Sequence, residues 1–459
     1  MVAMRRMRLS SSASVPIPLR VTNLEARPRE RRFGERRGQT VHRPARTANF
    51  GLNLAGARIT FVGINYVPEP TGIAPYTALF AESLAEAGAQ VEVITGVPHY
   101  PAWAVPEEYR RGLTWHEELS GVQVTRLRHW VPRVPNTIGR AALEASFMAE
   151  ATTTLVRRQS DAIIAITPSL AGLAAAVAGR RGRPVGALVQ DLTGQAAAQS
   201  GTTSDGFGSR LSKVEYGLLE RADLVGVITP DFHAALTDHG VEESKLVPLA
   251  NCIHVSAFAG TKAEARQKLQ WAADDFLVVY TGSLGRKQGL ETAIDAARGM
   301  AGSQYNVRFM IVGDGGELKS LRELAHDLDN VTFVPPVDAE HYPVVLAAAD
   351  ALLLTERPGV KEMSLPSKLT SYAVAGRPIV ASVARGGISE RLLVNTESAM
   401  VSAAGDVSAL LQNIKMIAED GEVRDRYAAY ASRLELADLS VGAATQRYRS
   451  FARDLLALR

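Results

Sequence analysis

The sequence predicts an α/β protein with two doubly wound domains, each built on a parallel sheet. Short runs that are apolar at every position alternate with amphipathic stretches of helical length between residues 58 and 383. Strands that are apolar throughout fit a parallel sheet buried on both faces. Regular alternation of strand and helix is typical of doubly wound folds. The 459 residues are enough for two such domains.

We expect four segments: a tail over residues 1–57, a first domain over 58–252, a second domain over 253–435, and a last helix over 436–459. The tail holds twelve Arg and three Glu, a net charge of +9, whereas the whole chain carries +3. Its Pro, Ser and Arg residues show no hydrophobic periodicity, which predicts disorder. Two interpretations stay open: electrostatic contact with an anionic membrane, or an extension without function.

The composition excludes several classes of protein. The single cysteine, Cys252, excludes an intramolecular disulfide and a cysteine-cluster metal site, and we expect it to be an inert apolar residue. No apolar run reaches 18 residues, so no transmembrane helix is predicted, and the tail lacks the apolar core of a secretory signal. Nucleic-acid binding would rest on the basic tail alone, and we do not expect it.

The first domain is predicted from strand-like runs over 59–64, 91–95, 122–127, 162–166, 185–189 and 224–228. Gly72 is the only glycine at the first strand-to-helix turn, so the dinucleotide fingerprint G-x-G-x-x-G is absent, which argues against a nicotinamide enzyme. His99 lies in an aromatic loop that suits a sugar surface, with a plain connector as the alternative. Asp191 follows a strand and is either a functional acid or a helix cap. Residues 194–210, rich in Gly, Ser and Ala, predict a mobile loop.

The second domain is predicted from runs over 276–280, 307–312, 331–334, 350–355 and 379–383. Between its last two strands, a short helix begins near Pro366, with Ser364 or Ser367 as its cap, and stops at Gly376. Free N–H groups at the start of this helix, with Lys368 beside them, favour a phosphate. The alternative is an ordinary βαβ unit with a surface lysine.

Ligands of doubly wound sheets bind outside the carboxyl ends of the strands. Two such domains facing each other would form a central cleft. We expect Gly72 of the first domain, and Lys287 and Lys368 of the second, to face into it.

Four stretches together resemble family 4 retaining glycosyltransferases, and within them the subgroup of bacterial colanic acid and other exopolysaccharide synthesis. They are INYVPEPTGIAPYTALFAESLAEAGAQVEVITGVPHYPAW, YTGSLGRKQGLETAIDAA, IVGDGGEL and LPSKLTSYAVAGRPIVAS. The resemblance covers about residues 58–455. It implies a GT-B fold, with a Rossmann-like acceptor domain followed by a Rossmann-like donor domain, and a last helix that crosses back to the first domain. It also implies a nucleotide-sugar donor, no metal, and retention of anomeric configuration.

The resemblance also assigns roles to residues. Arg286 or Lys287 matches the basic pair that neutralises the donor diphosphate, and Lys368 lies in the subgroup's Pro-Ser-Lys. The two family glutamates fall at Met363 and Ser371, with Glu362 one residue from the first, and the family histidine falls at Ile166, which leaves His129 as the nearest alternative. We therefore expect catalytic roles for Lys287, Lys368 and Arg286, and donor binding by Gly72, Gly282, Glu362, Ser367, Ser371, Gly386 and Gly387.

The expected function is metal-independent transfer of a sugar from a UDP- or GDP-linked donor to a glycan or polyprenyl-linked acceptor in cell-surface polysaccharide synthesis. No cofactor is expected. The missing glutamates leave open a non-catalytic nucleotide-sugar binding protein, and another GT-B enzyme acting on a soluble acceptor is a further alternative. We expect a cytoplasmic protein, with peripheral contact at the inner face of the plasma membrane as an open alternative.

Overall fold

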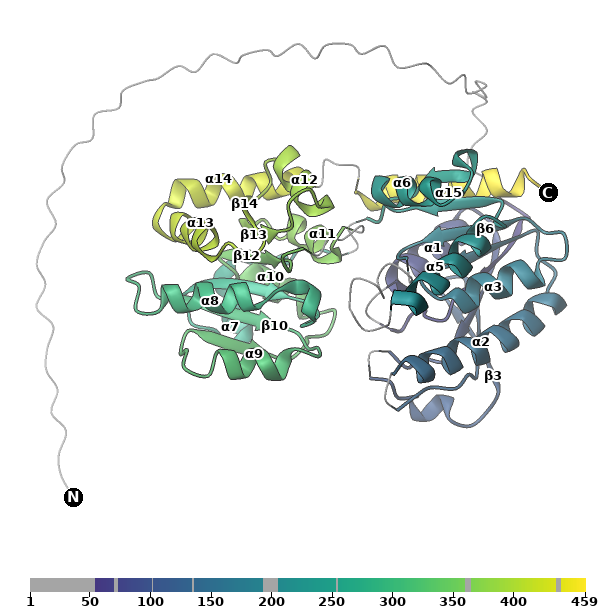
Figure 1. Cartoon of the computed structure of the whole chain (residues 1–459), viewed down its shortest axis with the longest axis horizontal. Coiled ribbons are helices and arrows are strands. Elements are labelled where there is room, and N and C mark those ends of the chain that lie inside the picture. The colour runs from purple at the N-terminus through teal and green to yellow at the C-terminus, as the bar shows by residue number, and fades with distance from the viewer. Residues whose placement is uncertain are drawn as a thin grey trace, which may run out of the picture. The chain divides into compact units, whose positions relative to one another are not determined.

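The strands form two separate sheets in the computed structural model (Figure 1). The structure describes residues 54–69, 73–100, 102–133, 136–192, 205–252, 255–359, 365–434 and 439–459. The predicted site residues Gly72 and Glu362, and the predicted disordered tail up to residue 53, lie outside these ranges. Among the described helices, none combines the length and the apolar character needed to span a bilayer.

The first sheet has the strand order β3-β4-β2-β1-β5-β6-β7-β8. Its strands are β1 (Arg58–Val62), β2 (Gln90–Gly96), β3 (Thr114–Leu119), β4 (Val122–Leu127), β5 (Ala162–Ile166), β6 (Val185–Val189), β7 (Leu224–Val227) and β8 (Leu246–Pro248). All neighbours pair in parallel except β3, which runs antiparallel to β4 at the edge of the sheet. The sequence did not predict β3, because this edge strand has no buried residue and hence no apolar run.

Helices connect the strands of the first sheet. They are α1 (Ala74–Glu86), α2 (Thr137–Arg157), α3 (Leu170–Gly179), α5 (Asp205–Leu219) and α6 (Pro230–Asp238). The prediction of a loop over 194–210 is wrong from residue 205 onward, where α5 has already begun. Its first turns contain two glycines, whose low helix propensity led to the prediction of a loop. Residues 193–204 lie outside the described ranges.

The second sheet is parallel throughout, in the order β11-β10-β9-β12-β13-β14. Its strands are β9 (Phe276–Thr281), β10 (Val307–Val312), β11 (Val331–Val334), β12 (Ala351–Thr355), β13 (Ile379–Val383) and β14 (Met400–Ala403). Its helices are α7 (Lys262–Leu269), α8 (Glu291–Met300), α9 (Leu318–Leu324), α10 (Tyr342–Ala348), α11 (Ser367–Val374), α12 (Ile388–Asn395), α13 (Val407–Glu419) and α14 (Gly421–Ala431).

The short helix α11 begins differently from its prediction. Pro366 is the N-cap residue and no side chain caps the helix, so the predicted cap at Ser367 is wrong. Ser367 is already helical, and its hydroxyl cannot reach the N–H groups that an N-cap residue serves. The other candidate, Ser364, lies outside the described ranges. At the other end, Gly376 adopts the expected left-handed conformation, with φ of +59°.

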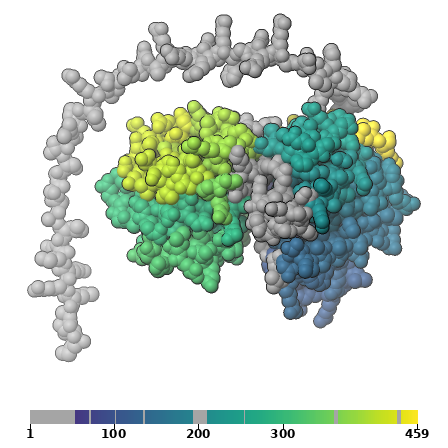
Figure 2. Space-filling view, in the orientation of Figure 1, coloured from purple at the N-terminus to yellow at the C-terminus, as the bar shows by residue number. Residues whose placement is uncertain are grey.

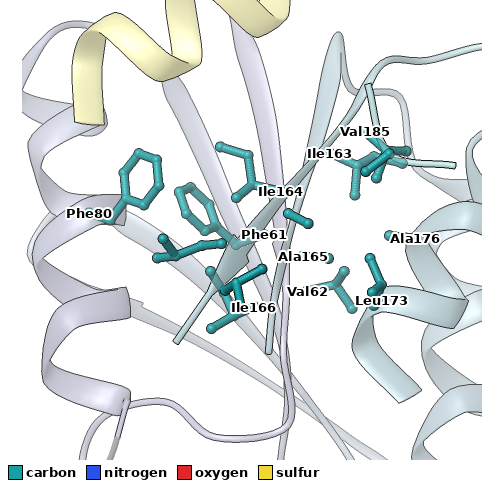
Figure 3. Close-up of a cluster of buried hydrophobic side chains, with 14 of the residues drawn as sticks. Phe61, Val62, Phe80, Ile163, Ile164, Ala165, Ile166, Leu173, Ala176 and Val185 are labelled. Carbon is teal, nitrogen blue, oxygen red and sulfur yellow. The ribbon is translucent and has the colours of Figure 1, made fainter. Parts of the chain in front are cut away.

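The core of the first domain explains why its central strands are apolar at every position. Figure 3 shows Phe61 and Val62 of β1 beside the β5 residues Ile163 to Ile166. Phe80 of α1 covers one face of these strands, and Leu173 and Ala176 of α3 lie in the same buried cluster. Because helices cover the strands, a polar side chain at any of these positions would be buried without water.

The last helix, α15 (Val441–Leu456), packs into the core of the first domain (Figures 1 and 2). The ring of Tyr448 stacks on Phe80 of α1 with centroids 4.3 Å apart. Phe451 is fully buried and lies over Gly186 of β6, where a Cβ atom would come within 2.8 Å of its ring. Aromatic contacts thus tie the end of the chain to α1 and β6.

Phe451→Ala should lower the free energy of unfolding by about 3–5 kcal/mol, because it leaves a cavity between α15 and β6. Urea denaturation followed by tryptophan fluorescence measures this loss. Trp103, Trp115 and Trp130 lie in the first domain and report its unfolding, whereas Trp271 lies in the second domain. Val441→Ala on the same helix, where the side chain is exposed, is the matched control and should change the midpoint little. An equal effect of both variants would contradict the packing.

Candidate functional site

The second sheet has a topological switch point between β9 and β12. From β9 the chain proceeds to β10 and β11 on one side, and then returns to β12 on the other side of β9. In doubly wound folds a crevice forms at this point, outside the carboxyl ends of the strands. The loop after β9, over residues 282–290, and residues 356–359 after β12 therefore flank the place where a ligand is expected.

Backbone hydrogen bonds join the loop after β9 to the loop after β10. Gly282 N–H donates to Val312 O at 3.0 Å, and Leu284 N–H donates to Asp314 O at 2.8 Å. The approach requires glycine at position 313, where φ is +148° and a Cβ atom would lie 1.9 Å from the carbonyl oxygen of Gly282. The two loops thus form one rigid backbone layer at this edge of the sheet.

Lys368 of α11 reaches this layer. Its Nζ donates to the Oη of Tyr280 at 2.7 Å and lies 3.9 Å from the centroid of the tyrosine ring. A Cβ atom on Gly282 would come within 3.4 Å of the Lys368 Cε and Nζ atoms. Two predicted site residues that are 86 positions apart in the sequence, Gly282 and Lys368, are therefore neighbours.

Tyr280 positions the ammonium group without cancelling its charge. Its hydroxyl donates to the carbonyl of Ser283 at 2.8 Å, which leaves a lone pair for Lys368. Burial, with Tyr372 and Tyr342 nearby, raises the pKa of Tyr280 well above its usual value, so the phenol stays neutral. The Lys368 ammonium therefore donates to a neutral phenol.

Arg286 and Lys287 lie in a 3-10 turn in the loop after β9. The Nε of Arg286, an exposed side chain, pairs with Glu317 at 3.5 Å. The carbonyl of Lys287 accepts a hydrogen bond from the N–H of Arg357 at 2.8 Å. Because Arg357 follows β12, this bond docks the turn onto the other side of the switch point.

Sequence reasoning missed Glu356, which directly follows β12. Its carboxylate is buried and accepts hydrogen bonds from the hydroxyl of Ser389 at 2.5 Å and from the N–H of Ala384 at 2.9 Å. These bonds hold the turn before α12, which contains the predicted residues Gly386 and Gly387. An acid immediately after the largely apolar run of β12 is a signal that could have identified Glu356.

The remaining predicted donor contacts differ in exposure. Ser367, the first residue of α11, is exposed, and its carbonyl accepts a bond from Thr370. Ser371 is buried and lies near Tyr342. Gly386, with φ of +70°, donates its N–H to the Glu390 carboxylate at 2.6 Å. Ser367 and Ser371 thus lie on α11, and Gly386 lies in the turn before α12.

At the corresponding edge of the first sheet, Asp191 accepts a hydrogen bond from its neighbour Leu192 at 2.8 Å. Gln190 and Asn251 exchange amide hydrogen bonds of 3.0 and 2.8 Å. His99 and His129 are both buried, with ring centroids 5.0 Å apart. Cys252 is buried as well, and burial raises the pKa of its thiol to about 11, in keeping with the expected inert residue.

Two family models match the chain, one in each domain. The model described as "Glycosyl transferase 4-like domain" matches residues 71–252. The model described as "Glycosyl transferases group 1" matches residues 261–434.

Curated relatives and solved structures agree with these matches. An Escherichia coli (strain K12) protein named as a colanic acid biosynthesis glycosyl transferase, WcaI, is 30% identical over 381 residues, or 77% of this chain and 92% of the relative. Sucrose-phosphate synthase from Thermosynechococcus elongatus has a TM-score of 0.70 at 19% identity, over 88% of this chain and 100% of that one. Anabaena HepE in complex with UDP-glucose has a TM-score of 0.63 at 18% identity, over 86% and 99%. The chain therefore belongs to the glycosyltransferases that join a 4-like domain to a group 1 domain, and its fold is GT-B.

Proposed function

We propose that this glycosyltransferase moves a sugar from a UDP- or GDP-linked donor to a glycan or polyprenyl-linked acceptor in the synthesis of a cell-surface polysaccharide. The name of the relative WcaI supports the pathway class. The solved complex of HepE with UDP-glucose supports a nucleotide-sugar donor.

The observation that carries the proposal is the ammonium of Lys368, held beside Gly282 at the switch point of the second sheet. Glycine allows a diphosphate to approach the backbone, and α11 directs its N-terminal N–H groups toward the same edge. A lysine held by a neutral tyrosine then supplies positive charge for the phosphate oxygens.

We also propose that the transfer proceeds without a metal ion and with retention of configuration. Negative charge develops on the nucleoside diphosphate as it departs, and fixed cations stabilise the transition state where that charge grows. Lys368 and Lys287 would take the role that Mg²⁺ has in other phosphate-releasing enzymes. The acceptor hydroxyl can lose its proton to the departing phosphate, so no protein base is required.

The acceptor proposal includes peripheral contact with an anionic membrane. Trp130 and Ile138 are exposed at 50% and 81%, although both are apolar. Arg133 and Arg140 are close to them in sequence, which combines apolar and basic side chains in one region of the first domain.

The double variant Trp130→Ser, Ile138→Ser should co-sediment less with phosphatidylglycerol vesicles than the unaltered chain does. Unchanged sedimentation would contradict this contact.

Lys368→Ala should lower kcat/KM for the donor by about 10²–10³-fold, the usual cost of removing one charge-stabilising group. Steady-state kinetics with the preferred nucleotide-sugar measures this loss. Lys319→Ala, which removes a lysine exposed at 90% on α9, is the matched control and should have almost no effect. Similar rates for both variants would remove Lys368 from the site.

A thermal-shift screen of the full chain against UDP, GDP and their common sugars, in the presence of EDTA, tests the donor. A ligand that binds only the folded state at a hundredfold excess over its Kd stabilises that state by about 2.7 kcal/mol. We expect a shift with one nucleotide class that survives EDTA and is lost in Lys368→Ala. A shift without any transfer would favour a non-catalytic binding protein, and no shift with any nucleotide would count against both functions.

A further inference from the structure

Two histidines of the first domain follow adjacent parallel strands. Gly96, the last residue of β2, lies opposite Leu127, the last residue of β4. His99 follows the first of these strands and His129 the second, so both imidazoles come to the carboxyl edge of the sheet. Their rings meet edge to face, with an interplanar angle of 72°. Only 5% of His99 and 7% of His129 is exposed.

Backbone carbonyls determine which ring nitrogen carries the proton. The Nδ1 of His99 lies 3.0 Å from Val97 O, and the Nδ1 of His129 lies 3.3 Å from Leu127 O. A carbonyl oxygen can only accept, so Nδ1 carries a hydrogen in each ring, and in a neutral His129 ring Nε2 then carries a lone pair. Burial and the nearby His99 lower the pKa of His129 to about 4, so this ring is neutral at pH 7.

The Nε2 of His129 is buried and has no hydrogen-bond partner within the described ranges. A buried acceptor without a partner is destabilising, and a leucine or phenylalanine would fill the same volume without this cost. The site is also rigid, because the carboxylate of Glu69 accepts hydrogen bonds from the N–H groups of His99 and Tyr100, both at 2.9 Å. Asn65 donates to the same carboxylate at 2.8 Å.

Aromatic side chains line the surroundings of the pair. The ring of Trp103 lies 5.8 Å from that of His99 and 6.3 Å from that of Tyr100, which is 42% exposed. The guanidinium of Arg140 lies 5.4 Å from the Trp103 ring. Apolar walls with a few oriented polar groups are typical of sites for small organic ligands.

The lone pair on an imidazole nitrogen determines which ligand groups can form a hydrogen bond with it. A hydroxyl group can donate a hydrogen bond to Nε2, whereas a phosphate or carboxylate oxygen at neutral pH brings only another lone pair. An anionic group would therefore face repulsion here, which discriminates as strongly as an attractive contact does. The site thus favours a polyhydroxylated ligand.

We propose that the Nε2 of His129 accepts a hydrogen bond from a hydroxyl group of the acceptor sugar, and that His129 with His99 determines which acceptor the enzyme uses. This inference rests on the proposed transfer to a glycan acceptor. It assigns the recognition of the acceptor hydroxyl to the lone pair of one buried imidazole, that of His129, and not to a charged group.

Histidine NMR on the ¹⁵N-labelled full chain tests the proposal directly, with methyl glycosides of glucose, galactose, mannose and fucose as probes. We expect the Nδ1–H tautomer of His129 at pH 7, and a shift of its Nε2 resonance on addition of at least one glycoside. The resonance of His326, whose side chain is 79% exposed in the second domain, is the internal control and should not move. The opposite tautomer, no response to any glycoside, or an equal response to inorganic phosphate would overturn the proposal.

Kinetics with p-nitrophenyl glycosides as acceptors separate recognition from packing. His129→Phe keeps a ring but loses Nε2, and should raise KM for the acceptor about tenfold, the loss of one hydrogen bond, with the nucleotide thermal shift unchanged. His129→Gln, whose amide oxygen can replace Nε2, should recover part of this loss. An unchanged acceptor KM in both variants would refute the role of His129. A missing nucleotide shift in the unaltered chain would instead refute the donor proposal, while the NMR result would still stand on its own.

Discussion

The carboxyl ends of β9, β10 and β12 reach one edge of the second sheet, where two loops approach more closely than side chains would permit. Gly313 brings its backbone against the carbonyl of Gly282, and hydrogen bonds between the two loops maintain this contact. The course of the loop after β9 follows from this approach, and Ser283 in that loop accepts the hydrogen bond of the Tyr280 hydroxyl. Tyr280 in turn holds the ammonium of Lys368. A site that acts through charge depends on such rigidity, because an error of about 1 Å in the position of a group weakens catalysis severely.

The carboxyl edges of the two sheets present different polar groups, cationic and N–H groups in the second domain and a lone pair in the first. In the second domain, Lys368 and the N–H groups of α11 favour an anion. In the first domain, Glu69 is already bonded to two N–H groups, and His129 offers only a lone pair. A phosphate oxygen that suits the site in the second domain would be repelled by the lone pair of His129 in the first domain. Side chains make this distinction, since both sheets belong to the same fold class.

Most strands could be predicted from the sequence because they are short and largely apolar, and burial at every position makes this pattern clearest in β5 and β6. The predicted bounds of β4, β5, β6, β10, β11 and β13 agree with the structure residue for residue. The edge strand β3 escaped prediction because none of its residues is buried. The start of α5 was wrongly placed in a loop, because its two glycines have low helix propensity.

The sequence by itself determined which residue types follow the strands: the glycine-spaced loop with Lys287 and the short helix with Lys368 could be named because turns and short helices are local features. Only the tertiary structure decided their partners. Lys368 bonds Tyr280 across 88 positions, Glu356 bonds Ser389 across 33, and His99 meets His129 across 30. The physical reason is that the order of strands in a sheet determines which loops become neighbours. Hydrophobic periodicity reports burial, and it carries no information about that order.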